Sequence, residues 1–401
     1  MTEPAGARPR RLRMFQKYPG ITLVVLVVLL AVGLDILGGL IYSVVIQAKQ
    51  RGVAPDSKKR ELLAQNEYYH HGLLPNKSVE GISWGNRRYS IYTNSLGFRD
   101  ASTRGIDPAS DKCRILFIGD SFTFAVGVDY RESFVGIIQN RLASGDIDVL
   151  NAAAESYSPV IYYRRIDDLL SQQRLRFDEA VVFLDIGDAE DEAYFYRIDE
   201  NNNVVSKEAN WLAEAQFEES GPQSTARRIV GFIRDHTVLF RFVWMNIRLR
   251  YALPRTDLKR SLWTLDKALY DEYGGSGLDK MQESMGRLRQ LLAKHGIALT
   301  IAVYPWPDQI VHRDLDSVHV RFWRKWAEAN GVGFFNLFPA FIDGPDPEDT
   351  LRKYYIKGDV HWNEAGHKLV AEKFVDFYCR QQSHAADCRA RVCDGGVRRK
   401  K

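Results

Sequence analysis

The sequence of 401 residues has little cysteine, no low-complexity tract and no internal repeat, and these absences narrow the class of protein. Four cysteines exclude a small scaffold held together by disulfides. Thirty glycines and 14 prolines are too few for a collagen-like or a disordered chain. With 45% hydrophobic and 26% charged residues, the composition is that of an ordinary globular protein. The length allows two or three average domains, or one large α/β domain with insertions.

A large excess of one charge sign is also absent, since the net charge is only +4, but the charges are unevenly placed. Residues 1–60 contain ten Lys or Arg and three Asp or Glu, and residues 380–401 contain seven and two. The intervening residues 61–379 contain 38 basic and 46 acidic residues. Because nucleic-acid-binding domains gather basic residues on a folded face, this acidic body argues against a nucleic-acid partner.

One long apolar run is present, and no second run approaches its length, which predicts a single-pass membrane protein. Residues 21–46 are apolar at all but four positions. At about 1.5 Å per residue they extend roughly 39 Å, against a hydrocarbon core of about 30 Å. The basic residues within 1–20 fit a cytoplasmic N-terminus, although basic residues also follow the run. A cleavable signal peptide is the alternative, but the run is long for one and no small-residue cleavage site closes it.

Asp35 lies just past the middle of this run, where a charge costs roughly 2.5–3.5 kcal/mol on insertion scales. One interpretation is a polar contact with another membrane helix, which Gly33, Gly38 and Gly39 would allow to approach closely. The other is a protonated or snorkelling residue in a single anchor. The sequence leaves both interpretations open.

The rest of the chain predicts a linker over 47–66, an α/β domain over 67–379 and a basic, cysteine-containing tail over 380–401. From about residue 112, short apolar strands alternate with helical patterns, which is typical of a parallel sheet covered on both faces. We expect strands at 114–118, 148–151, 180–186, 298–304 and 333–337, and helices at 132–142, 160–170, 278–294 and 318–330. Residues 200–275 interrupt the alternation and form either an insertion beside the sheet or a lid or substrate-side subdomain.

Two motifs at opposite ends of the predicted α/β domain carry candidate catalytic residues. Gly-Asp-Ser at 119–121 follows the first strand, so Ser121 is expected at the carboxyl edge of the sheet, where open α/β folds gather ligands. Asp359 and His361 lie just before the last helix, for which Asn363 is the expected cap. A serine hydroxyl needs a base, and the base needs a carboxylate that orients it. We therefore predict Ser121 as nucleophile, His361 as base and Asp359 as orienting acid.

Together these motifs resemble the SGNH (GDSL-type) hydrolase superfamily over most of residues 65–378. Asp-x-His-Trp at 359–362 and the stretch 92–99 are similar to a membrane-anchored bacterial branch that includes alginate O-acetyltransferase-like proteins. The resemblance implies a flavodoxin-like three-layer α/β/α domain with a parallel five-stranded sheet and a helical insertion, working without cofactor or metal. It also implies a single-pass inner-membrane protein with a periplasmic catalytic domain.

The function that this resemblance implies is that of a serine-dependent esterase or O-acetyltransferase acting on cell-surface or exported glycans. A transferase would need an acyl donor delivered across the membrane, which implies a multi-spanning partner protein. The alternative is a catalytically weak glycan-binding or assembly subunit of a polysaccharide modification complex. Because Ser121, Asp359 and His361 are all retained, the enzyme is the preferred interpretation.

The two middle motifs of the superfamily are altered in this sequence. In the family, an oxyanion hole usually combines the backbone N–H of the nucleophile, here Ser121, with the backbone N–H of a glycine. Ser156 stands in the place of that glycine, and its backbone N–H can still donate. Asp188 is the nearest match to the usual Asn donor. An ionised Asp cannot donate, and one lost donor costs about 2.7–4 kcal/mol. Either Asp188 is protonated, another donor replaces it, or activity is weak.

Two clusters of metal-ligand residue types are present, and neither predicts a metal site. The acidic run at 185–192 is compatible with a divalent cation, but a solvated loop is the default interpretation. His70 and His71 either line the cleft or bind metal, but no third ligand follows at a suitable spacing, so surface or packing roles are preferred.

The cysteines divide into one isolated residue and one cluster. Cys113 opens the first strand and is predicted to be a buried free thiol. Cys379, Cys388 and Cys393 follow the last helix, and outside the cytoplasm one pair is expected to form a disulfide that the sequence does not specify. The basic C-terminal residues 398–401 predict a disordered tail, suited to anionic lipid or an acidic glycan.

Overall fold

The computed structural model describes residues 18–50, 59, 61–85, 87–142, 147–206, 260–380 and 393. The chain divides into two units. The first unit combines residues 1–52 with 219–254, and the second combines residues 53–218 with 255–401. The second unit contains every candidate catalytic residue.

The described part of the first unit is helix α2 (Pro19–Gln50), which includes the apolar run at 21–46. Several of its apolar side chains are exposed, among them Leu23, Leu30 and Leu34. Across the described ranges, no helix combines the length and the apolarity that crossing a bilayer demands. The membrane anchor stays a prediction.

The second unit is built on an eight-stranded sheet with the order β12-β11-β8-β6-β7-β5-β4-β3. Its first five strands are parallel: β6 (Cys113–Ile118), β7 (Ile147–Asn151), β8 (Glu179–Leu184), β11 (Ala298–Val303) and β12 (Gly333–Asn336). Each predicted strand is confirmed, with ends within two residues of those expected. Their order is that of a doubly wound, flavodoxin-like sheet.

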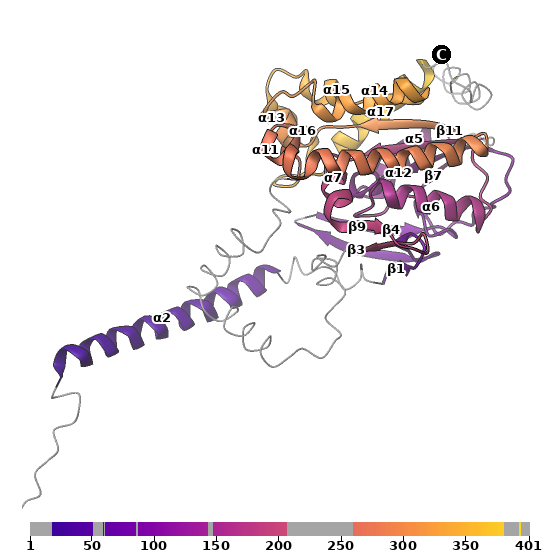
Figure 1. Ribbon diagram of the computed structural model, residues 1–401. Helices are drawn as coiled ribbons and strands as arrows, with labels where there is room; N and C mark the ends of the chain where they lie inside the picture. Colours follow the sequence, from indigo (N-terminus) through magenta and orange to yellow (C-terminus); the bar gives the residue numbers. More distant parts are fainter. Residues whose placement is uncertain are drawn as a thin grey trace, which may run out of the picture. The chain divides into compact units, whose positions relative to one another are not determined.

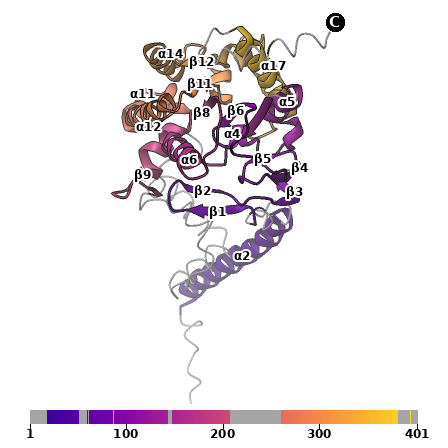
Figure 2. The ribbon, with the colours of Figure 1, turned by 90° about the vertical axis from the view of Figure 1, so that its right-hand side faces the viewer.

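Helices cover both faces of the parallel strands, which confirms the predicted three layers (Figure 1). Figure 2 shows α6 (Pro159–Ser171), α12 (Gly275–Lys294) and α14 (Val318–Asn330) on one side of the sheet, and α5 (Phe134–Leu142) and α17 (Glu364–Arg380) on the other. The shorter helical segments are α4 (Ser121–Phe124), η1 (Tyr130–Glu132), α7 (Asp188–Glu190), η2 (Asp191–Phe195), η4 (Leu262–Thr264), α11 (Lys267–Leu269), η5 (Tyr270–Gly274), α13 (Pro307–Val311), α15 (Phe338–Ile342) and α16 (Pro347–Tyr354). The core lies between these layers, where rings such as Phe117, Phe134 and Phe374 pack together.

The sheet continues beyond the five predicted strands, so its predicted extent is wrong. The strands β5 (Arg99–Asp100), β4 (Arg87–Thr93) and β3 (Ser78–Trp84) extend it in antiparallel order from the edge of β7. We refer to these three strands as the antiparallel extension. Because β5 is only two charged residues long, no alternation of apolar and polar residues can mark it in the sequence.

Two separate hairpins flank this sheet. One pairs β1 (Leu63–Asn66) with β2 (His70–Leu73), and the other pairs β9 (Tyr196–Ile198) with β10 (Val204–Ser206). The strand β1 lies inside the predicted linker at 47–66, so regular structure begins earlier than predicted, in a strand too short to show a period. Most of the predicted insertion, residues 207–259, lies outside the described residues.

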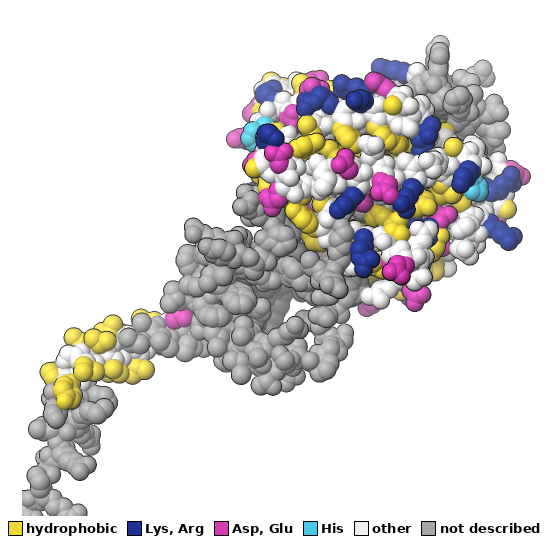
Figure 3. All heavy atoms as spheres, in the orientation of Figure 1, with side chains coloured by type: hydrophobic (Ala, Val, Ile, Leu, Met, Phe, Trp, Pro, Cys, Tyr) yellow, Lys and Arg dark blue, Asp and Glu magenta, His cyan; other side chains and the backbone are white. Residues whose placement is uncertain are grey.

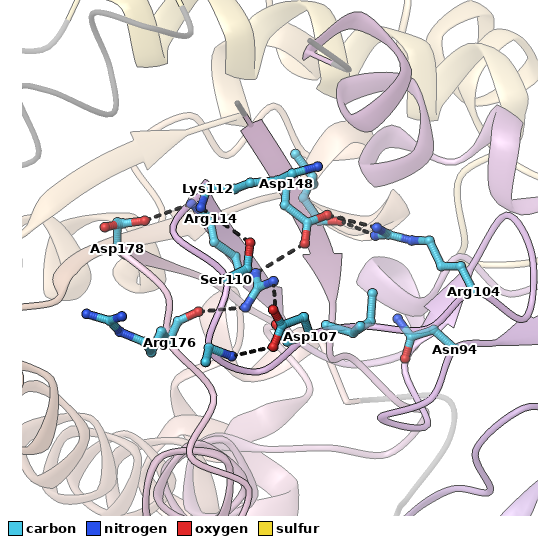
Figure 4. Close-up of polar contacts among 12 residues, drawn as sticks. Asn94, Arg104, Asp107, Ser110, Lys112, Arg114, Asp148, Arg176 and Asp178 are labelled. Atoms are coloured by element: carbon cyan, nitrogen blue, oxygen red, sulfur yellow. Dashed lines mark hydrogen bonds and ion pairs between the residues drawn. The ribbon is translucent and has the colours of Figure 1, made fainter. Parts of the chain in front are cut away.

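A buried ion-pair network holds the amino-terminal edge of the parallel strands (Figure 4). Arg114 on β6 contacts Asp148 Oδ2 on β7 through its Nε at 3.1 Å. Its remaining nitrogens donate to the carbonyls of Arg176 and Asp107 at 2.9 and 3.0 Å. Arg104 contacts the other oxygen of Asp148 at 3.0 Å. Because these donors are satisfied, the cost of burying the charge is offset, and β6 is fixed at the end opposite the candidate site.

On the face of the second unit drawn in Figure 3, basic and acidic side chains are intermixed over the outer helices. Some are paired along one helix, as with Arg287 and Glu283 of α12, which lie 2.6 Å apart. Lys267 and Asp271 form a second exposed pair at 2.7 Å. Such pairs contribute at most a few tenths of a kcal/mol each. This face therefore carries mixed charge rather than a patch of one sign.

The cysteines differ from the prediction at one position. Cys379 near the end of α17 is bonded to Cys393, which specifies the pair that the sequence left open. Cys113 is also disulfide-bonded, so the predicted free thiol is wrong. An apolar strand start shows that a thiol will be buried, but it carries no information about a second sulfur that approaches from elsewhere in the chain.

Candidate active site

Ser121 lies at the carboxyl end of β6, as its motif predicts, and is the first residue of α4. The strand β6 has β7 on one side and β8 on the other. Helix α5, which leads from β6 to β7, and helix α6, which leads from β7 to β8, lie on opposite faces of the sheet. Ligands gather at such a switch point in open α/β sheets. Asp120 caps α4 by accepting from the backbone N–H of Phe122 at 3.0 Å. As the first helical residue, Ser121 has a backbone N–H without an intrahelical acceptor.

The structure brings His361 within hydrogen-bonding distance of both of its predicted partners. Its Nε2 lies 2.8 Å from Ser121 Oγ, across 240 residues of sequence. Its Nδ1 lies 2.5 Å from Asp359 Oδ1, which also accepts from the His361 backbone N–H at 3.0 Å. In the neutral imidazole, Nδ1–H then donates to Asp359 and Nε2 accepts from Ser121.

The loop between α16 and α17 presents these two residues. The Ile356 backbone N–H donates to the carbonyl of His361 at 2.9 Å, which closes the loop on itself. Asn363 Oδ1 accepts from the Gly366 backbone N–H at 3.0 Å, so the predicted cap of the last helix is confirmed. Fixed at both ends, the loop restricts the directions in which the imidazole can point.

Trp84, the last residue of β3, provides an unpredicted contact to this site. Its indole Nε1–H donates to Asp359 Oδ2 at 2.7 Å. Burial by itself would raise the pKa of Asp359, but the hydrogen bonds and charge of His361 and the bond from Trp84 lower that pKa to about 2. Asp359 is therefore ionised near neutral pH, which is the state that stabilises an imidazolium.

Ser156 lies in the loop after β7, the strand that pairs with β6. Its φ of +61° is left-handed, the region that a glycine adopts without strain. The end of β7 is tied to α4, because Asn151 Nδ2 donates to the carbonyl of Thr123 at 2.9 Å. Within the described part of the chain, the Ser156 backbone N–H donates to no acceptor. It is thus available as a donor.

Asp188 begins α7 after β8 and is buried. Its Oδ2 accepts two hydrogen bonds, from the Tyr162 hydroxyl and from the Asp185 backbone N–H, both at 3.1 Å. Burial, followed by the charges of Asp185, Asp120 and Asp191, raises the pKa of Asp188 well above its ordinary value. A neutral carboxyl with Oδ2 as its carbonyl oxygen carries its proton on Oδ1. This arrangement has one accepting and one donating group, as the amide of Asn has.

The rest of the acidic run is buried too, so the predicted solvated loop is wrong. Asp185 accepts from Trp306 Nε1 at 2.7 Å and from the Gly187 backbone N–H at 2.5 Å. Arg260 lies 2.7 Å from Asp191 and 3.1 Å from Glu190. A cation about 70 residues away in sequence allows these carboxylates to be buried. Among the described residues, no group of three metal-ligand side chains is placed to hold a metal ion.

His70 and His71 contact each other and the Ser156 loop. Their Nδ1 atoms lie 2.7 Å apart, and His71 Nε2 lies 2.8 Å from the carbonyl of Glu155. Because a carbonyl only accepts, His71 Nε2 carries the proton, His71 Nδ1 accepts and His70 Nδ1 donates. Burial lowers the pKa of His70 to about 4 and also lowers the pKa of His71, so both rings are neutral near pH 7. The pair supports the loop, as the packing interpretation predicts.

No family model and no curated protein matches the chain. Among solved structures, it is similar to the acetyl xylan esterase AlAXEase, at 15% identity and a TM-score of 0.37 over 66% of this chain and 98% of that one. It is similar to a G-D-S-L-family lipolytic protein from Desulfitobacterium hafniense, at 14% identity and a TM-score of 0.37 over 66% and 99%. It is also similar to the acetylxylan esterase Axe2 from Geobacillus stearothermophilus, at 13% and 0.36 over 68% and 96%.

Proposed function

We propose that the protein is a membrane-anchored, serine-dependent acyl-ester enzyme, an esterase or an O-acetyltransferase, that acts on cell-surface or exported glycans. The observation that carries this proposal is the continuous contact from Asp359 through His361 to Ser121, with distances of 2.5 and 2.8 Å. A serine, a base within hydrogen-bonding reach and a carboxylate that orients the base are together the requirements for nucleophilic acyl transfer.

In the proposed reaction, Ser121 Oγ attacks the ester carbonyl carbon while His361 Nε2 takes its proton. Asp359 stabilises the imidazolium that forms. The tetrahedral intermediate collapses, the bond to the alcohol breaks, and His361 returns the proton to the leaving oxygen. Water or a sugar hydroxyl then attacks the acyl-serine with the same base, which gives hydrolysis or transfer.

Three donors are proposed for the oxyanion: the backbone N–H groups of Ser121 and Ser156, and a neutral Asp188. The hydroxyl of Tyr162 lies 3.1 Å from Asp188 Oδ2 and 3.3 Å from the carbonyl of Tyr157, which follows Ser156. Asp188 therefore lies near the Ser156 loop, which supports a shared role for the two residues. The raised pKa of Asp188 supports the neutral form that donation requires.

The compartment and the partner are part of the same proposal. The disulfide between Cys379 and Cys393 suits an oxidising compartment such as the periplasm, and the exposed apolar side chains of α2 suit an inner-membrane anchor. Transfer would further require a multi-spanning partner that brings the acyl donor across the membrane, with Asp35 as a candidate contact. Retention of the full chain in the membrane fraction after alkaline carbonate washing tests the anchor, and its release would contradict it.

The test of the nucleophile uses the full chain in detergent with p-nitrophenyl acetate. Ser121→Ala is expected to lower kcat/KM by at least about 10³-fold, because no other side chain is proposed to form the acyl-enzyme. The control is Ser102→Ala, which removes an exposed hydroxyl from a loop and should leave the rate unchanged. Equal rates for wild type and Ser121→Ala would overturn the assignment.

A second assay separates the enzyme from the catalytically weak glycan-binding subunit. Acetylated and unacetylated oligosaccharides are offered to wild type and to Ser121→Ala. Loss of acetyl groups to water identifies an esterase, and their appearance on the second oligosaccharide identifies a transferase. Tight glycan binding by both proteins, with negligible turnover by either, would favour the subunit.

A further inference from the structure

The antiparallel extension reaches the catalytic residues through the side chain of Trp84. Asp359 has two carboxylate oxygens, and His361 occupies one of them through both its ring and its backbone N–H. The other oxygen, Oδ2, accepts from Trp84 Nε1 at 2.7 Å. The ring of Trp84 also stands edge-on to the imidazole, with centroids 5.6 Å apart and planes at 85°. One side chain thus contacts both the acid and the base.

The surroundings of Trp84 hold the indole in this position. Gly127, with φ of +77°, lies against it, and a Cβ at that residue would come within 3.1 Å of the indole and 3.0 Å of Ile356. Arg87, which pairs with Trp84 across the hairpin, donates to the carbonyl of Gly127 at 2.9 Å and forms an ion pair with Glu364 at the start of α17. The hairpin end is therefore fastened both to the loop after α4 and to the helix that follows His361.

The charged groups that face the indole are few among the described residues. Lys59 lies 5.2 Å from the ring centroid and pairs with Glu155 at 2.5 Å, in the loop that carries Ser156. Asp359 lies at the N–H edge, with His361 beside it. Trp84 therefore stands between the triad and a charge pair of the Ser156 loop, and no other described donor contacts Asp359 Oδ2.

We propose that Trp84, the last residue of β3, is a positioning residue for the triad. Asp359 lies on a loop, and a carboxylate held by one oxygen only can rotate away from the imidazole. The indole N–H, delivered from a sheet, fixes the second oxygen and thereby the direction of the bond to His361 Nδ1. This inference rests on the proposed function, because it gives Trp84 a role in the reaction assigned to Ser121.

The decisive substitution is Trp84→Phe, which keeps an aromatic ring against His361 and removes the N–H. We expect kcat/KM for p-nitrophenyl acetate to fall by about 10- to 100-fold, mostly in kcat, since supporting partners of catalytic groups typically contribute that much. The acid limb of the pH profile should move to higher pH. Without the donor, the carboxylate is less stabilised as an anion, so the pKa of Asp359 rises and the imidazolium is held more strongly.

The matched control is Tyr92→Phe on β4, which removes one exposed hydrogen bond, to Glu80 at 2.8 Å, from the same pair of strands. It should change neither kcat nor the pH profile. The active fraction of each protein is counted by stoichiometric labelling with a fluorophosphonate, so that loss of folded protein is not read as loss of rate.

The outcomes separate this inference from the proposed function. A wild type that neither turns over substrate nor labels would remove both. Normal Ser121-dependent turnover in wild type, with Trp84→Phe unchanged in kcat and in pH profile, would overturn the role of Trp84 only. A fall in active fraction without any shift of the acid limb would identify Trp84 as a folding residue and would likewise overturn it.

Discussion

The five parallel strands and the antiparallel extension contribute to the candidate site in different ways. The loops after β6, β7 and β8 present Ser121, Ser156 and Asp188, the groups that would touch the reacting atoms. The extension presents none of these groups. It provides donors that hold other residues in place, with Trp84 on Asp359 as its direct link to the triad.

Arg99 of β5 shows the same kind of support at a second place. Its guanidinium is buried and donates to the carbonyls of Phe124, Ala125 and Val128, in the turn that ends α4. The position of α4, which begins at Ser121, thus depends on a strand outside the parallel part. Under the proposed function, the parallel part therefore supplies the reacting groups, whereas the extension supplies contacts that hold them in place.

After loss of Ser121 itself, the largest effect expected in the parallel part follows substitution of Asp188. Asp188→Ala removes one oxyanion donor and should lower kcat by about 10²- to 10³-fold. Asp188→Asn should keep the wild-type rate near neutral pH. As pH rises through the raised pKa of Asp188, the wild type loses its donor and slows, whereas the Asn variant does not titrate.

Rates of the three proteins between pH 6 and 10 check this expectation. Because neither variant can ionise at this position, they also serve as controls for each other's effect on the buried acidic group. If the Asn variant were as slow as the Ala variant, Asp188 would not be the third donor. The site would then rest on the two backbone N–H groups alone.

A smaller effect on rate, with a large effect on stability, is expected for Arg99→Met in the extension. The substitution leaves three carbonyls without their donor and should lower the free energy of unfolding by roughly 2–5 kcal/mol. Arg176→Met is the control, because its guanidinium is exposed and, among the residues that the structure describes, pairs with Asp111 alone, at 3.3 Å. Denaturant unfolding measures both. If Arg99→Met kept full stability while abolishing activity, the division between chemistry and rigidity would fail.

The smallest expected effect is on stability in acid, and it concerns Asp359, whose bond from Trp84 joins the two regions. The folded-state pKa of Asp359 is about 2, below the ordinary value of about 3.9. The stabilisation by its partners is therefore complete above about pH 4 and is lost as pH falls through 2. The difference in Tm between wild type and Asp359→Asn should narrow from pH 5 to pH 2. A difference that stays constant over this range would show that the contacts do not stabilise the carboxylate.

The parallel part could be predicted because each of its strands is an apolar run long enough to be recognised, followed by a helical period. Ser121, Asp359 and His361 stand at the ends of such elements, so their motifs point to one edge of the sheet. The extension could not be predicted, since Trp84 and Asp359 are 275 residues apart and their contact depends on how the sheet is completed.

The burial of Asp185 and Asp188 was equally beyond prediction, because a run of acidic residues normally indicates a solvated loop. Its burial depends on Arg260 and on the Tyr162 hydroxyl, neither of which any local pattern connects with it. The disulfide of Cys113 belongs to the same class. In each case, a contact between distant segments decides the environment of a residue, and the neighbouring sequence predicts a different environment.

The most direct test of the central claim is to trap the nucleophile in the full chain. A fluorophosphonate forms a bond from Ser121 Oγ to phosphorus, fluoride leaves, and His361 takes the proton. We predict one label per chain, mapped by peptide mass spectrometry to the peptide that contains Ser121, and its loss in His361→Ala. A label on another residue, or equal labelling of His361→Ala, would contradict the catalytic assignment.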